Sequence, residues 1–204
     1  MILAAANDPP SARSLAEGDL RRVNQDLRGQ TERFALVLGD SHAVGLAAHM
    51  PCQRVSAAVG GLKAADVAEQ VRRLDIRKPP AAVLLAVGTN DMLRKHRPLQ
   101  SRRDWVSSLQ KAVAPFRGLG ARVIVLALPP IGRELDRVFE QSAVAPYSEA
   151  LEEMCRADGC IYADPWTDAR SDKFGQGRPE AMSDNLHLDD YRPAMKALEP
   201  LACG

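Results

Sequence analysis

The sequence predicts an α/β fold with an open, mostly parallel five-stranded sheet between layers of helices. Five short apolar segments alternate along the chain with segments whose apolar residues recur at helical spacing. The apolar residues of the first segment, 34–38, are continuous rather than alternating, which is expected for a parallel strand covered on both faces. Glycine, proline or polar residues mark the ends of these segments. This alternation of strands and helices predicts a three-layer α/β/α domain.

Length and charge exclude several classes of protein. The chain has 204 residues, which fits one domain, and 46% of them are hydrophobic, which is enough for a buried core. Lys and Arg number 27 and Asp and Glu 26, so the charge balance gives no reason to expect a nucleic-acid partner. No apolar run approaches the ~18 residues of a membrane span. The first ten residues lack the features of an intact signal peptide, so we expect a cytoplasmic protein, or an exported one whose leader was removed.

Residues 1–33 form a polar, alanine-rich extension ahead of the main domain, which we place at residues 34–204. Leu20, Val23 and Leu27 fall at helical spacing and predict a short amphipathic helix around residues 12–28. This helix could pack on the domain as an additional layer or fray from it. No residue in the extension suggests chemistry.

The strands are expected where apolar segments are bounded by turn residues. Pro79-Pro80 precedes the third strand and Pro129-Pro130 ends the fourth, and proline is excluded from helix interiors. The expected strands are residues 34–38, 53–56, 81–87, 121–128 and 160–163.

The helices are expected between these strands and after the last of them. Ser101 and Asp104 form a capping-box pattern, and Pro146 suits a first helical turn. The expected helices are residues 43–50, 62–74, a segment following Ser101, a segment around 146–154, and residues 190–201. Residues 164–189, rich in Asp, Ser, Gly and Pro, are expected to form a long loop.

The four cysteines give no metal-binding pattern. They are scattered and include no CxxC pair, so a zinc knuckle is not expected. In a chain of this length we expect small buried thiols rather than disulfides. The residues concerned are Cys52, Cys155, Cys160 and Cys203.

Ser41 lies directly after the first strand, where functional groups of parallel sheets collect. Serine is a poor nucleophile until a base accepts its proton, and the base needs a carboxylate to orient it. His187 lies on a loop at the expected end of the sheet, with Asp184 three residues before it. His42 follows the serine directly, so the two side chains should diverge. We therefore expect Ser41 to be the nucleophile, His187 the base and Asp184 its orienting group.

An acyl-transfer site also needs donors for the developing oxyanion. We expect three: the backbone N–H of Ser41 at a helix start, the backbone N–H of Gly61, and the side-chain amide of Asn90. Gly61 and Asn90 each lie just past a predicted strand. Gly60 is an alternative to Gly61 as the second donor.

Four segments of the chain together resemble, in order, the conserved blocks of the SGNH hydrolase (GDSL-type esterase/lipase) superfamily. The segments are Gly39-Asp40-Ser41-His42, Gly61, Gly88-Thr89-Asn90-Asp91, and Asp184 with His187. The resemblance implies a flavodoxin-like fold and ester hydrolysis through an acyl-serine, with no metal or organic cofactor. The partner expected for such an enzyme is a small-molecule or saccharide ester. Short acyl groups, with O-acetyl groups on a saccharide included, are expected from the small chain and the lack of a lid-like insertion. His42 departs from the pattern, because leucine often stands there in the family.

Several site residues also have plainer explanations. Ser41 could cap the first helix, and Asn90 could be a turn residue. Asp164 could orient the histidine in place of Asp184. Asp40 and Asp91 are expected to tie loops together rather than act in chemistry.

Two further features lie near the predicted site. A basic run at residues 94–97 could favour anionic substrates, although such runs are commonly solvated. Tyr162 and Trp166 are expected to pack rather than to stack on a sugar.

There are three alternatives to this function: one fits the same residues equally well, and two fit them less well. An O-acyltransferase would use the same triad, with an acceptor hydroxyl in place of water. A nonenzymatic flavodoxin-like binding domain would need a phosphate loop, and the stretch after the first strand has neither G-x-G-x-x-G nor a Walker lysine. A member of the α/β-hydrolase class is disfavoured because Ala43 occupies the last position of the G-x-S-x-G elbow.

Overall fold

The computed structural model describes residues 12–171 and 175–204. Its main sheet has five parallel strands in the order β2-β1-β3-β4-β6, which is the flavodoxin-like order. The strands are β1 (Ala35–Gly39), β2 (Arg54–Ser56), β3 (Ala82–Ala86), β4 (Arg122–Leu126) and β6 (Ile161–Ala163). Each lies within a predicted apolar segment or overlaps it, so the predicted fold class is confirmed.

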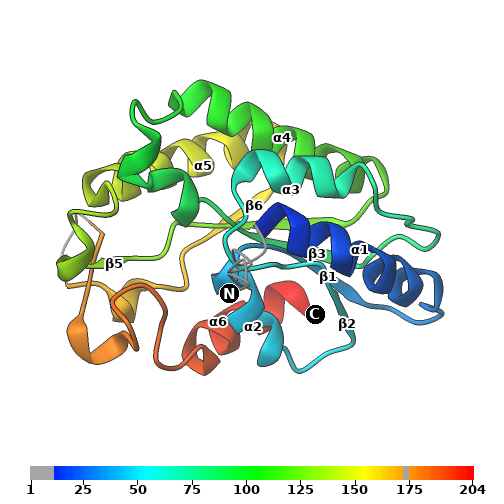
Figure 1. Ribbon diagram of the computed structural model, residues 1–204. Coiled ribbons are helices and arrows are strands. Elements are labelled where there is room, and N and C mark those ends of the chain that lie inside the picture. The colour runs from blue at the N-terminus through cyan, green and yellow to red at the C-terminus, as the bar shows by residue number, and fades with distance from the viewer. Residues whose placement is uncertain (1–11, 172–174) are drawn as a thin grey trace, which may run out of the picture.

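Helices cover both faces of the sheet (Figure 1). One face carries α1 (Ala12–Arg28), α3 (Ala64–Val71), α4 (Arg102–Gly118) and α5 (Val144–Asp158), and the other carries α2 (Ser41–Ala48) and α6 (Arg192–Ala202). Successive side chains of β1 enter different cores, because side chains alternate along a strand. Leu36 and Leu38 join the core under α3 and α4, whereas Ala35 and Val37 join the core under α2 and α6. The continuous apolar run of β1 is therefore explained by burial on both faces.

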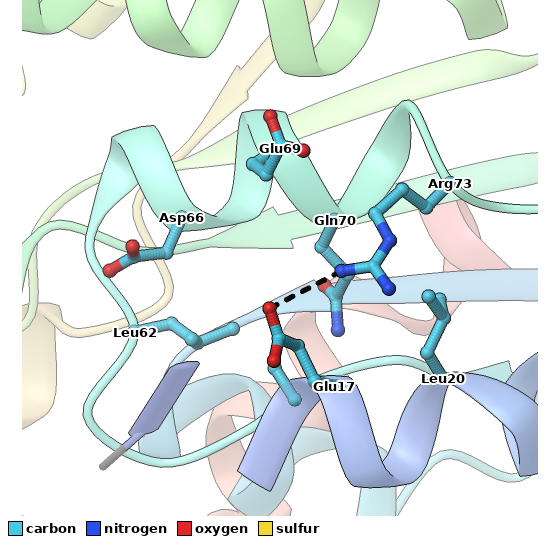
Figure 2. Close-up of a pocket in the computed structure, with 8 residues that line it drawn as sticks. Glu17, Leu20, Leu62, Asp66, Glu69, Gln70 and Arg73 are labelled. Carbon is cyan, nitrogen blue, oxygen red and sulfur yellow. Dashed lines mark ion pairs between the residues drawn. The ribbon is translucent and has the colours of Figure 1, made fainter. Parts of the chain in front are cut away.

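The N-terminal helix α1 packs on the domain, the first of the two alternatives for this segment. Its side chains Val23 and Leu27 are buried in the core shared with α3. Asn24 ties it to the chain after α3, because its amide donates to the carbonyl of Arg73 at 3.0 Å. Figure 2 shows Glu17 facing Arg73 across a small pocket between α1 and α3, with 3.5 Å between the paired atoms. This pocket lies apart from the predicted catalytic residues.

The expected long loop at residues 164–189 is partly structured. Two-residue strands β5 (Ile131–Gly132) and β7 (Gln176–Gly177) pair in parallel. Short 3₁₀ helices form at Thr167–Ala169 and Pro179–Ala181. The periodicity of such short elements is too brief to distinguish from loop sequence, and the two strands pair across distant segments of the chain.

The expectation of free thiols is wrong, because all four cysteines are paired. Cys52 and Cys203, 151 residues apart, join the segment after α2 to the end of α6. The two helices lie side by side on one face of the sheet (Figure 1), so the fold brings these cysteines together. Cys155 and Cys160 flank the turn at Gly159, whose φ of 73° lets the chain reverse after α5. Sequence spacing gave no signal for either pair.

The two disulfides should contribute differently to stability. Replacing Cys52 and Cys203 by alanine is expected to lower the free energy of unfolding by about 3–5 kcal/mol, and replacing Cys155 and Cys160 by about 2 kcal/mol, because a longer loop constrains the unfolded chain more. Urea unfolding of the parent and the two double variants measures the difference. Equal losses would show that loop length does not govern the stabilisation.

None of the helices in the described part of the chain has the length and apolar character of a membrane span.

Candidate active site

Ser41 is positioned by the close approach of the end of β1 to the neighbouring strand β3. Gly39 ends β1 with φ 137°, and a Cβ built there would lie 1.8 Å from the carbonyl oxygen of Ala86 in β3. Only glycine permits this approach. Asp40 then caps α2, since its Oδ1 accepts the N–H of His42 at 3.0 Å. Because Asp40 and not Ser41 is the cap, the hydroxyl of Ser41 is left available, and the helix starts two residues earlier than expected.

Asp184 and His187 are held by a tight turn. Asp184 Oδ1 accepts the backbone N–H of Leu186 at 3.0 Å and that of His187 at 2.7 Å. Between them Asn185 adopts a left-handed φ of 65°, which asparagine tolerates better than most residues. The N–H of Ser183 closes the turn by donating to the carbonyl of His187 at 2.9 Å. The turn therefore fixes the carboxylate and the imidazole relative to each other.

The structure brings the predicted nucleophile, base and orienting carboxylate into one hydrogen-bonded chain. His187 Nε2 lies 2.8 Å from Ser41 Oγ across 146 residues of sequence. His187 Nδ1 lies 2.8 Å from Asp184 Oδ2. This geometry suits an imidazole that donates through Nδ1–H and accepts the serine proton at Nε2.

The carboxyl of Asp184 is ionised at neutral pH. Desolvation alone would raise its pKa, but hydrogen bonds from the backbone and ring of His187 and from Leu186 lower the pKa to about 2. Asp184 thus faces the imidazole as an anion, which favours the Nδ1–H tautomer.

The predicted oxyanion donors lie on the loops after β1, β2 and β3. Ser41 is the first residue of α2, so its N–H has no acceptor within the helix. Gly60 adjoins the serine, because a Cβ built on Gly60 would lie 3.7 Å from Ser41 Cβ. Gly61 has a left-handed φ of 82°, which favours glycine. Asn90 donates one amide N–H to the carbonyl of Leu62 at 3.1 Å, which fixes its orientation and leaves its second N–H.

Asp40 is buried and Asp91 is half-buried, and both lie behind the site. Burial raises the pKa of Asp40 to about 7, opposed by backbone N–H groups of His42, Gly88 and Thr89. Burial likewise raises the pKa of Asp91 to about 6. Asp91 Oδ2 accepts the N–H of Ala64 at the start of α3 at 3.1 Å. These contacts join loops, as expected from the sequence.

The other candidates take part in packing and ion pairs. Asp164 pairs with Arg170 and accepts the N–H of Trp166 at 3.2 Å, and it makes no contact with His187 among the contacts of the described residues. Trp166 is fully buried, and its indole donates to the carbonyl of Ala127 at 2.7 Å, which agrees with the packing role expected for it.

The basic run at residues 94–97 is partly neutralised. Arg94 lies 3.0 Å from Asp136 and 3.5 Å from Glu140, and Arg97 also pairs with Glu140. The run therefore joins the loop after β3 to the loop after β5 instead of presenting all of its basic side chains to solvent.

Sequence reasoning missed the surroundings of His42. This side chain is 1% exposed, and its Nδ1 lies 3.0 Å from the hydroxyl of Tyr191. Burial, followed by the charge of His187, lowers the pKa of His42 to about 3, so it is neutral. The sequence feature that could have pointed to these surroundings is the histidine at a position where the family often has leucine.

No group of three or more His, Cys, Asp or Glu residues in the described part of the chain is arranged to hold a metal ion.

A known protein family and several solved structures resemble this chain. The family model of the GDSL-like lipase/acylhydrolase family matches residues 14–191. A GDSL-like lipase from Bacteroides thetaiotaomicron has a TM-score of 0.69 at 12% identity, with 90% of this chain and 95% of that one covered. A lipase/acylhydrolase from Enterococcus faecalis has a TM-score of 0.67 at 14% identity, covering 83% and 93%. An acetyl xylan esterase has a TM-score of 0.65 at 18% identity, covering 83% and 98%. No curated protein sequence matches.

The family model spans most of the chain, including the segments that carry Ser41, Asn90 and His187. The structural neighbours share the three-layer fold with its parallel sheet. The chain is therefore a hydrolase that belongs to the GDSL-like lipase/acylhydrolase family.

Proposed function

We propose that the protein is a serine esterase that hydrolyses carboxylic esters of short acyl groups, including O-acetyl groups on saccharides, through an acyl-enzyme on Ser41. The observation that carries this proposal is the hydrogen-bonded chain from Ser41 Oγ through His187 to Asp184, with both heavy-atom distances at 2.8 Å. A nucleophile, a base and an orienting anion are the groups that acyl transfer needs.

In the first step Ser41 Oγ attacks the ester carbonyl carbon while His187 Nε2 takes the serine proton. A tetrahedral intermediate forms, and the imidazolium is stabilised by the anionic Asp184. His187 then gives its proton to the leaving alcohol as the ester C–O bond breaks. The acyl group remains on Ser41.

In the second step water replaces the alcohol. His187 accepts a proton from the water as the water attacks the acyl carbon, and it returns that proton to Ser41 Oγ as the acid leaves. An acceptor hydroxyl in place of water would make the same site an acyltransferase.

We propose that the oxyanion is held by the N–H of Ser41, the N–H of Gly61 and the free amide N–H of Asn90. The left-handed φ of Gly61 supports its assignment, because a side chain there would strain the turn. The bond from Asn90 to Leu62 supports the assignment of Asn90, because it preorganises the amide before substrate binds.

Replacing Asn90 by alanine is therefore expected to lower kcat by about 10²–10³-fold. Its side chain donates to one backbone carbonyl, so the loss of stability should be about 1 kcal/mol. Steady-state kinetics and thermal unfolding of the variant check both. An unchanged kcat would remove Asn90 from the oxyanion hole.

Two observations support the substrate and the compartment. The fold is similar to that of an acetyl xylan esterase, which is why acetylated saccharides are the first substrates to try. All four cysteines are in disulfides, which persist in oxidising compartments and are rare in the cytosol. We propose an exported protein on this ground.

The experiment that tests the function compares p-nitrophenyl esters of increasing acyl length with acetylated xylo-oligosaccharides, and follows the released acid with and without an added acceptor alcohol. The highest kcat/KM is expected for acetyl esters, with free acetate as the product. Transfer of the acyl group to the alcohol in preference to water would favour the acyltransferase. No turnover of any ester would contradict both.

A further inference from the structure

We propose that Tyr191 and His42 form a positioning pair that holds the loop of Asp184 and His187 against the helix of Ser41 and so sets the alignment of base and nucleophile. The inference rests on the proposed function of this site. It concerns residues that would not touch the substrate.

The pair connects the helix that carries Ser41 to the loop that carries Asp184 and His187. His42 directly follows Ser41 on α2, and Tyr191 ends the segment that carries the base. The hydroxyl of Tyr191 lies 3.0 Å from His42 Nδ1, across 149 residues of sequence. Both side chains are buried, with 8% and 1% of their surfaces exposed. A hydrogen bond excluded from water at this place restricts how far the loop can move from the helix.

The ring of His42 also packs beside the catalytic imidazole. Its centroid lies 5.5 Å from that of His187, with 34° between the planes, and 6.0 Å from the ring of Tyr191. Trp166 contacts His42 edge-on at a centroid distance of 6.0 Å. His187 therefore packs against a ring that is itself held in place by two larger aromatic side chains.

Gly45 leaves room on α2 for the ring of Tyr191. A Cβ built on Gly45 would lie 2.6 Å from the tyrosine ring. Glycine in a helix interior costs roughly 0.5–1 kcal/mol relative to alanine. That cost is offset by the close approach of the ring to the helix backbone, which places its hydroxyl at His42.

The hydrogen-bond pattern argues against a purely stabilising role. The hydroxyl of Tyr191 and His42 Nδ1 share one hydrogen bond. The second ring nitrogen of His42, Nε2, is buried and has no hydrogen-bond partner in the described part of the chain. A buried polar group left unsatisfied costs about 1–3 kcal/mol. An apolar pair of similar shape would stabilise the fold at least as well.

The test is a double-mutant cycle of Tyr191→Phe, His42→Leu and the combination of both, assayed with the best p-nitrophenyl ester. Each single variant is expected to lower kcat by about 10-fold or more, because small misplacements of catalytic groups are costly. KM should stay within about twofold, since neither residue is placed to contact substrate. The double variant should lose no more than the worse single variant, because both remove one interaction.

Thermal unfolding shows whether a loss of activity comes from misaligned catalytic groups or from a destabilised fold. The double variant exchanges a hydrogen-bonded pair for apolar groups, so its midpoint should remain within a few degrees of the parent. Tyr147→Phe is the matched control. Tyr147 is another buried tyrosine, whose hydroxyl donates to the carbonyl of Gln100 away from the triad, and its kcat and KM should not change.

The outcomes distinguish this inference from the proposed function. An active parent whose kcat survives Tyr191→Phe unchanged would overturn the positioning pair alone. Losses in kcat that add in the double variant, or that follow the loss of thermal stability, would also overturn it. A parent with no activity on any ester would instead refute the proposed function.

Discussion

Replacing Ser41 by alanine is expected to lower kcat for ester hydrolysis by at least about 10⁴-fold, because no other group in the proposed mechanism can form the acyl-enzyme. Ser41 is not the cap of α2, and its hydroxyl contacts His187 Nε2. Its removal should therefore leave the fold intact. The measurement is steady-state hydrolysis of the best p-nitrophenyl ester, with the melting temperature of both proteins as the check on folding.

Labelling with a fluorophosphonate probe gives an independent reading of the same change. The parent should be labelled on Ser41, and the alanine variant should not be labelled. Ser108→Ala is a matched control, since the hydroxyl of Ser108 donates to the carbonyl of Asp104 within α4. Labelling or turnover that persists in Ser41→Ala would mean that another residue is the nucleophile. No labelling of the parent would favour a binding domain.

The fold was predictable where the physical signal is local. β1 and β3 are apolar over five buried residues, and few elements other than doubly covered strands have this pattern. Helix α1 was predictable because Leu20, Val23 and Leu27 repeat at helical spacing within it. The parallel sheet followed from the alternation of strands and helices, whereas the flavodoxin-like arrangement of the strands was implied by the family resemblance.

The errors lie where the signal is not local. Cys52 and Cys203 pair because α2 and α6 pack on the same face of the sheet, and nothing in their own sequence neighbourhoods indicates it. The pairing of Ile131–Gly132 with Gln176–Gly177 joins two-residue strands that have no measurable periodicity. Such contacts follow from the assembled fold.

In the site, too, the local features were predictable from the sequence and the non-local ones were not. Asp184 and His187 were predictable as a pair because a three-residue step lets one turn present both side chains. Their meeting with Ser41 was inferred from the rule that functional groups collect at the carboxyl ends of parallel strands. The contact of His42 with Tyr191 could not be inferred this way, because it depends on the approach of a ring to Gly45.

Replacing Asp184 by asparagine is expected to lower kcat by roughly 10⁴-fold through the tautomer of His187. The two backbone N–H groups of Leu186 and His187 point at the Oδ1 position, so the amide oxygen of an asparagine must occupy it. The amide N–H₂ then faces His187 Nδ1, which can only accept. The imidazole proton moves to Nε2, where it blocks acceptance of the proton from Ser41.

Asp189→Asn is the matched control for this change, because Asp189 is an exposed carboxylate two residues beyond the base. Its kcat should stay within about twofold of the parent, since surface charges contribute little. The pH–rate profile and the melting temperature of both variants complete the comparison. The two backbone hydrogen bonds survive in Asp184→Asn, so the turn should persist and a loss of activity would report the tautomer. Full activity in this variant would mean that the carboxylate only shapes the turn, and that another group orients the imidazole.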